Sequence, residues 1–123
     1  FKRFRAIDLP LSDTEEALQY FQRVNQSYPT SKYAQKAKKY INKCKTYLAR
    51  HEIYVADFYW NTGKYLSAWK RYEYVKETYQ DRKSLYNYAR KRSRMAYLKY
   101  QEVLAKEKRR QIEGSWKDWF EWL

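Results

Sequence analysis

Few side chains in this sequence could act as acids, bases, nucleophiles or metal ligands, and they are widely spaced. His51 is the only histidine and Cys44 the only cysteine, so the ligands of a typical zinc site are lacking. Paired carboxylates such as Glu73 and Glu77 have the spacing of helix-surface ion pairs. The motifs HExxH, CxxC and GxSxG are absent, as is a phosphate-binding glycine run. We therefore expect a protein that is not an enzyme and that holds no metal or cofactor.

The strong positive charge indicates a binding partner of opposite sign. Lysine and arginine number 27 against 14 aspartates and glutamates, which gives a formal net charge of +13. Such a balance suits an acidic protein, an anionic lipid surface or nucleic acid. Tyrosines between the basic residues could stack on bases, but most of them fall at helix-packing positions and no nucleic-acid-binding motif is present. A basic helical module for nucleic acid or an anionic membrane surface stays open as the weaker alternative.

Length and composition favour one helical domain. The chain has 123 residues, with only two glycines and two prolines but fifteen tyrosines, and large half-polar rings fill the grooves between helices well. No apolar run approaches the ~18 residues that span a bilayer. Because the sequence opens on Phe1 and not on methionine, we interpret it as a fragment or a processed product. Cys44 lies on an apolar helix stripe, where a buried, inert thiol is expected.

The stretch from His51 to Gln80 organises the rest of the chain. Two runs with helical periodicity flank Gly63, which has the character of a left-handed residue that ends one helix before the next begins. Small residues, Ala56 and Ala68, are expected where the two helices touch. This pattern is typical of a tetratricopeptide repeat, a helical hairpin of about 34 residues.

Further helices precede and follow this hairpin. Residues 1–11 are interpreted as a connecting arm. Ser12 with Glu15 predicts a capping box at the start of a helix that stops before Pro29. From Ser31 to Thr62 neither glycine nor proline occurs, so one helix of roughly 31 residues, about 46 Å long, is expected.

The C-terminal part is expected to contain two more helices. A basic helix from Ser84 to Ile112 would end at Gly114, and Ser115 would start a short last helix. We expect residues 12–112 to form the repeat domain and residues 113–123 an amphipathic capping helix that folds back onto the preceding helix. Alternatively, the last helix lies in a membrane interface or in a partner's groove. Its apolar face would contain Trp116, Trp119, Phe120 and Leu123.

The predicted fold is therefore all-α. It is a tetratricopeptide-repeat-like helical solenoid fragment with one long central helix and a short Trp-rich C-terminal helix.

One segment resembles a known family. LARHEIYVADFYWNTGKYLSAWKRYEYV is similar to the pattern LAxHExYVAxYYxxxGxYxAAxxRxxxVxxxYP of the BamD family, tetratricopeptide lipoproteins of the outer-membrane β-barrel assembly machine. The resemblance spans residues 13–79. It implies a non-catalytic scaffold of outer-membrane protein assembly and insertion, working with a BamA-like barrel subunit and other subunits of the machine. It also implies the periplasmic face of a Gram-negative outer membrane, with a lipid anchor in a missing N-terminal part.

The resemblance also suggests a docking site. In the family, an arginine on the second helix of the last repeat makes a salt bridge to a POTRA module of the barrel subunit, and Arg71 falls at that position. Arg71 and Lys70 lie off the Ala68–Tyr72–Val75 packing stripe and can reach outward. The expected partner-binding residues are Lys64, Tyr65, Trp69, Lys70 and Arg71. Beyond Asp81 the chain departs from the family, with a longer basic helix and a candidate interface helix at Trp116, Trp119 and Phe120. This end of the chain could add contacts with anionic lipid headgroups or with an acidic partner.

Overall fold

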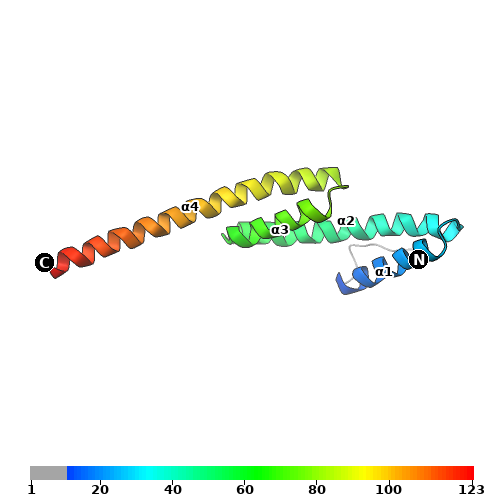
Figure 1. Ribbon diagram of the computed structural model, residues 1–123, viewed down its shortest axis with the longest axis horizontal. Coiled ribbons are helices and arrows are strands. Elements are labelled where there is room, and N and C mark those ends of the chain that lie inside the picture. The colour runs from blue at the N-terminus through cyan, green and yellow to red at the C-terminus, as the bar shows by residue number, and fades with distance from the viewer. Residues whose placement is uncertain (1–10) are drawn as a thin grey trace.

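The computed structural model describes residues 11–123 as four helices and no strand (Figure 1). The helices are α1 (Leu11–Ser27), α2 (Lys32–Asn61), α3 (Tyr65–Thr78) and α4 (Lys83–Trp122). The all-α prediction is confirmed. The predicted connecting arm lies outside the described residues except for Leu11, which begins α1. Ser12 therefore lies inside the first turn of α1, and the prediction that it caps this helix was wrong.

The long helix α2 is the element on which the others pack. α1 lies along its first half and α3 along its second half (Figure 1). Ser31 caps its N-terminus as predicted, because the Ser31 hydroxyl oxygen accepts a hydrogen bond of 3.1 Å from the Ala34 backbone N–H. With 30 residues, α2 confirms the prediction of one long central helix.

Gly63 ends α2 as the sequence predicts. Its φ of +77° lies in the left-handed region, which costs a glycine little because it has no Cβ. The Gly63 N–H donates to the Trp60 carbonyl at 3.1 Å, and the Lys64 N–H donates to the Tyr59 carbonyl at 2.8 Å. These two bonds form a Schellman motif, which satisfies carbonyls that the end of α2 leaves open.

Two groups of buried side chains hold the helices together. Between α1 and α2, the Phe21 and Tyr40 rings stack with centroids 4.9 Å apart, next to the fully buried Cys44. Burial also raises the pKa of the Cys44 thiol, so the predicted inert thiol is consistent with its surroundings. The larger group joins α2, α3 and α4, where small residues let the helices approach closely around Tyr72 and Val75; its fully buried alanines are Ala49, Ala56, Ala68, Ala89 and Ala96.

The C-terminal part of α4 differs from the prediction. Gly114 does not end the helix, which runs on through Ser115 to Trp122, and no separate capping helix exists at residues 113–123. Gly114 does not adopt a positive φ, and a helix tolerates an interior glycine at a cost of only about 1 kcal/mol. α3 has 14 residues and α4 has 40, so α4 extends well past its neighbour (Figure 1).

The two glycines offer a matched test of these helix ends. Gly63→Ala should lower the free energy of unfolding by about 1 kcal/mol, because a Cβ is strained in the left-handed region. No atom lies within 4 Å of the added Cβ at either glycine, so steric clash does not enter the comparison. Gly114→Ala should not destabilise, and should increase helicity at the end of α4. Urea unfolding and circular dichroism measure both effects; an equal loss of stability in the two variants would contradict the continuous helix.

Candidate docking surface

Tyr65 and Trp69 hold α3 to its neighbours. The Tyr65 ring meets the Trp60 ring of α2 edge-on, with centroids 5.1 Å apart. The Trp69 ring lies 5.5 Å from that of Tyr97 on α4. Both side chains are partly buried, and aromatic pairs of this geometry stabilise packing beyond their buried area. These two members of the predicted partner-binding set therefore contribute mainly to the internal packing of the repeat.

The charged members of the predicted set lie at the surface. Lys64, Lys70 and Arg71 are exposed, and the Arg71 side chain keeps 44% of its area accessible. The Arg71 Nη1 donates a hydrogen bond of 2.9 Å to Oε2 of Glu52 on α2. This hydrogen bond is the main reason why the pKa of Arg71 is raised. Arg71 is thus held in place from inside the protein while much of its guanidinium faces solvent.

The five predicted residues do not form one patch. Successive residues of a helix are turned by about 100°, so Trp69 and Arg71 point about 200° apart. Trp69 faces α4 and Arg71 faces α2, as their contacts show. Lys70 lies between them, and Tyr74, one turn further along the same side, is 48% exposed. Of the predicted residues on α3, only Lys70 and Arg71 are therefore available to a partner, and Tyr74 lies beside them.

Sequence reasoning missed Glu52 and Tyr74 as parts of this surface. Glu52 is 19 positions from Arg71 in sequence and meets it only because the hairpin at Gly63 turns α3 back along α2. The hairpin predicted at Gly63 was the sequence signal that could have identified Glu52. In such a hairpin the two helices are antiparallel, so the last turns of one lie beside the first turns of the next. Tyr74 carried no signal among fifteen tyrosines.

A polar network fixes α3 between α2 and α4. The Asp57 carboxylate accepts a hydrogen bond from the Tyr72 hydroxyl and another, at 3.0 Å, from the Tyr88 hydroxyl. The Arg92 Nε donates to the Tyr88 hydroxyl oxygen at 3.2 Å, and the guanidinium lies 5.3 Å from the centre of the Trp60 ring. Because Tyr72 is fully buried, its hydroxyl needs such a partner. The network restricts how α3 can rotate and so restricts where Arg71 points.

Two further contacts tie α4 to the rest of the protein. Glu73 of α3 accepts hydrogen bonds from the Ser93 hydroxyl and, at 2.9 Å, from the Lys76 ammonium. Burial alone would raise the pKa of Glu73, but these two donors outweigh it and the pKa is lowered. In the turn before α4, the Arg82 Nη1 donates to Asn42 at 2.6 Å. These contacts make α2, α3 and the first half of α4 one packed unit.

The described residues contain neither a metal site nor a helix able to span a membrane. Within residues 11–123, no group of histidine, cysteine, aspartate and glutamate side chains is placed to hold a metal ion. In the same range, no helix has both the length and the apolar character that crossing a membrane requires.

The fold and this surface define the class of protein, a tetratricopeptide-like helical protein with exposed basic residues on and next to α3. The chain belongs to the YfiO family of outer membrane lipoproteins, the BamD family, whose model matches residues 3–112. A comparison with curated proteins found no match. The resemblance predicted from residues 13–79 is confirmed, and membership associates the chain with the outer membrane and its protein assembly machinery. The match ends at Ile112, so it does not include the Trp-rich end of α4.

Tyr79, the buried residue at the C-cap of α3, predicts that the fold loses stability at alkaline pH. Burial raises the pKa of Tyr79 to about 12, with smaller contributions from Tyr74 and Glu52. An unfolded tyrosine ionises near pH 10, so between about pH 10 and 12 the unfolded state has lost a proton that the folded state keeps. The free energy of unfolding should therefore fall as pH rises through this range, by about 1 kcal/mol at pH 11 from Tyr79 alone. Urea unfolding at pH 8 and pH 11 measures this fall.

The control for this measurement is Tyr79→Phe, whose ring cannot ionise. This variant should lose less stability than the wild type between the two pH values. An identical loss in both proteins would show that Tyr79 does not contribute.

Proposed function

We propose that this chain is a non-catalytic scaffold in the assembly and insertion of outer-membrane β-barrel proteins. It docks through α3 to a POTRA module of the BamA-like barrel subunit, at the periplasmic face of the outer membrane. A lipid anchor in a preceding segment would hold the protein there, beside other subunits of the machine. Family membership supports the role. The observation that carries the docking site is the exposure of Arg71, which the resemblance places at the position of the family's salt-bridging arginine.

The geometry around Arg71 suits recognition of a carboxylate. A guanidinium has five N–H donors in a planar fork, and its hydrogen bond to Glu52 uses one of them. Glu52 thereby restrains the Arg71 side chain, which reduces the entropy lost when a partner binds. An acidic side chain on the POTRA module can then accept further hydrogen bonds from Arg71.

Lys70 and the net charge act at longer range. Lys70 is exposed next to Arg71 and has no role in the packing of α3. Together with the formal charge of +13, it would steer an acidic surface toward α3 before close contact forms. The network at Asp57 keeps α3 from rotating, so a docked barrel subunit is held in a fixed orientation. This rigid positioning is the mechanism that we propose for the scaffold.

The test is binding of the purified chain to a POTRA-containing partner. Arg71→Glu should weaken binding by at least about tenfold, because it places a negative charge against an acidic surface. The matched control is Arg90→Glu, since Arg90 is an exposed arginine on α4 and the change in charge is the same. Equal weakening by both variants would show that net charge, and not the Arg71 site, drives binding.

Glu52→Gln separates docking from an internal role of Arg71. Glutamine removes the charge that competes with the partner for Arg71 but retains a hydrogen-bond acceptor. Binding should therefore be unchanged or up to a few times tighter. If Glu52→Gln weakened binding as much as Arg71→Glu, the pair would act by stabilising the hairpin and the proposed site would be wrong.

A duplex DNA shift assay at physiological salt tests the alternative of nucleic-acid binding. Under the scaffold proposal, DNA binding should be weak and should fall steeply with added salt, as expected from charge alone.

A further inference from the structure

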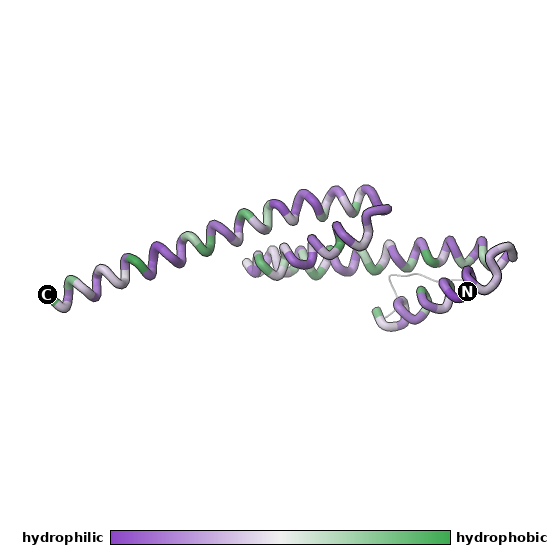
Figure 2. The backbone as a smooth tube through the Cα atoms, viewed as in Figure 1, coloured by the Kyte–Doolittle hydropathy of each residue, from purple (hydrophilic) through white to green (hydrophobic). Residues whose placement is uncertain are grey.

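The projecting end of α4 has no neighbour among the described residues. Every residue from 105 to 123 is exposed, and this segment is about 27 Å long. Figure 2 shows hydrophobic residues recurring along it. We use the name aromatic stripe for five residues of this segment with exposures of 52% to 78%: Ile112, Trp116, Trp119, Phe120 and Leu123.

The aromatic stripe faces away from the body of the protein. Its members Ile112, Trp116, Trp119 and Leu123 are spaced by four, three and four residues, which places them on one side of a helix. α4 packs on α3 through Ala89 and Ala96. Twenty residues separate Ala96 from Trp116, which corresponds to about 200° of rotation, so the stripe lies opposite the packing face. The segment does not fold back as a cap because α4 continues without a break through Gly114.

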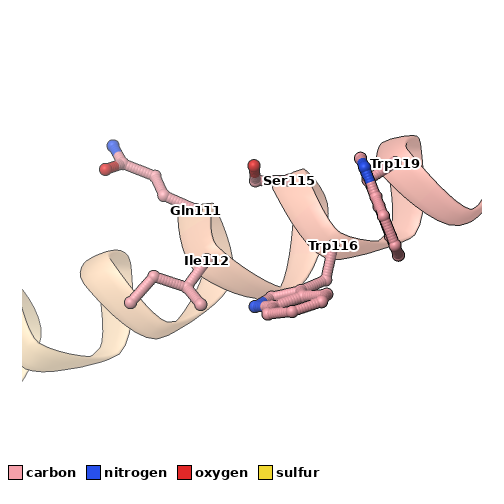
Figure 3. Close-up of a pocket in the computed structure, with 5 residues that line it drawn as sticks. All are labelled: Gln111, Ile112, Ser115, Trp116 and Trp119. Carbon is pink, nitrogen blue, oxygen red and sulfur yellow. The ribbon is translucent and has the colours of Figure 1, made fainter.

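Figure 3 shows the same arrangement at the level of side chains. Ile112 and Trp116 lie on one side of the helix, whereas Gln111 and Ser115 lie on the other. The rings of Trp116, Trp119 and Phe120 contact one another, with centroids 5.3 to 6.3 Å apart. The five residues labelled in Figure 3 line a hollow on the protein surface, and all of them belong to α4. The hollow is therefore part of the surface of a single helix and not a cavity between elements.

Most charged residues of the segment are divided by sign between its two sides. Lys108 and Arg109 lie on the side of the aromatic stripe, one turn before Ile112, as the angle of about 100° per residue requires. Asp118 and Glu121 are turned about 200° and 140° from Trp116, on the side away from the stripe, as is Glu107 at about 180°. Glu113, about 60° from Trp116, lies at the edge of the stripe. One side therefore combines aromatic rings with two cations and one carboxylate, and three of the four acidic groups of residues 105–123 point away from it.

We propose that the aromatic stripe binds the surface of an anionic lipid bilayer. Tryptophan is enriched at membrane interfaces, where its ring is buried among acyl chains and its N–H stays near the headgroups, and the stripe contains Trp116 and Trp119. Lys108 and Arg109 would meet anionic headgroups, while the acidic side faces water. A flat surface of negative charge fits this two-sided distribution. The family of outer membrane lipoproteins places the chain beside a bilayer, and the inference does not depend on docking at Arg71.

The experiment uses the full chain with two kinds of vesicle. One contains phosphatidylethanolamine with anionic phosphatidylglycerol, and the other contains phosphatidylcholine alone. The wild type should sediment with the anionic vesicles, and its tryptophan emission should shift to shorter wavelength. A wild type that binds neither vesicle would overturn the proposal.

Two pairs of variants locate the contact. Trp116→Ala combined with Trp119→Ala should lower partitioning at least about tenfold. Trp122→Ala should lower it less than about twofold, because Trp122 is 85% exposed but turned about 100° from Leu123 on the stripe. Lys108→Glu should reduce binding to anionic vesicles about fivefold or more, and Lys117→Glu, with the same change of charge off the stripe, should reduce it less. Equal effects within either pair would overturn the assigned face.

Sedimentation velocity tests whether a second copy of the chain covers the stripe instead. A monomer that binds vesicles supports the proposal. A dimer that the Trp116/Trp119 double variant abolishes, together with vesicle binding that the double variant leaves unchanged, would contradict it. Because all of these residues are exposed, the variants should retain the fold, and circular dichroism checks this.

Discussion

The Asp57 carboxylate joins three of the four helices. It lies on α2 and accepts hydrogen bonds from Tyr72 on α3 and Tyr88 on α4. The Tyr72 ring is fully buried, so its hydroxyl would be costly to leave without a partner. The buried alanines and aromatic rings between α2, α3 and α4 stabilise the packing, but hydrophobic contacts do not fix an orientation. These hydrogen bonds are directional and therefore set the rotation of each helix about its axis. The outward direction of Arg71 depends on that rotation.

Most of the fold was predictable from local sequence signals. Gly63 and Ser31 identified helix ends because the left-handed region and the N-cap each demand particular residue types. The absence of glycine and proline between residues 31 and 62 identified the long helix. The buried alanines marked where helices touch, since only small side chains permit close approach. The capping box predicted at Ser12 failed because α1 already includes Leu11, so Ser12 lies within its first turn.

The end of the chain was predicted less well. Gly114 and Gly63 are the same residue type, and each could end a helix. Whether a glycine does so depends on the stability of the helix on both sides of it. Trp116, Trp119 and Phe120 were correctly placed on one helix face, yet a capping role required that face to meet the body. Along one uninterrupted helix, this face is turned about 200° from Ala96, so it cannot lie on the side through which α4 packs. Because a break was assumed at Gly114, this angle was not considered.

The exposure of Arg71 was predictable from the sequence, but the surroundings of Arg71 were not. The matched family pattern pointed to Arg71, and helical periodicity showed that it lies off the packing stripe. Its partner Glu52, and the division of the predicted set between two flanks of α3, follow from the way α3 packs between α2 and α4. These relations are tertiary and leave no local trace in the sequence.

A charge-reversal cycle between Arg71 and the POTRA module tests the central claim most directly. Arg71→Glu is paired in turn with substitution of each acidic surface residue of the module by arginine, and binding free energies are measured for the single and double variants. The account predicts that one acidic position restores binding, with a coupling of about 1.5 kcal/mol or more. If no position restores binding while every variant remains folded, docking through Arg71 is contradicted.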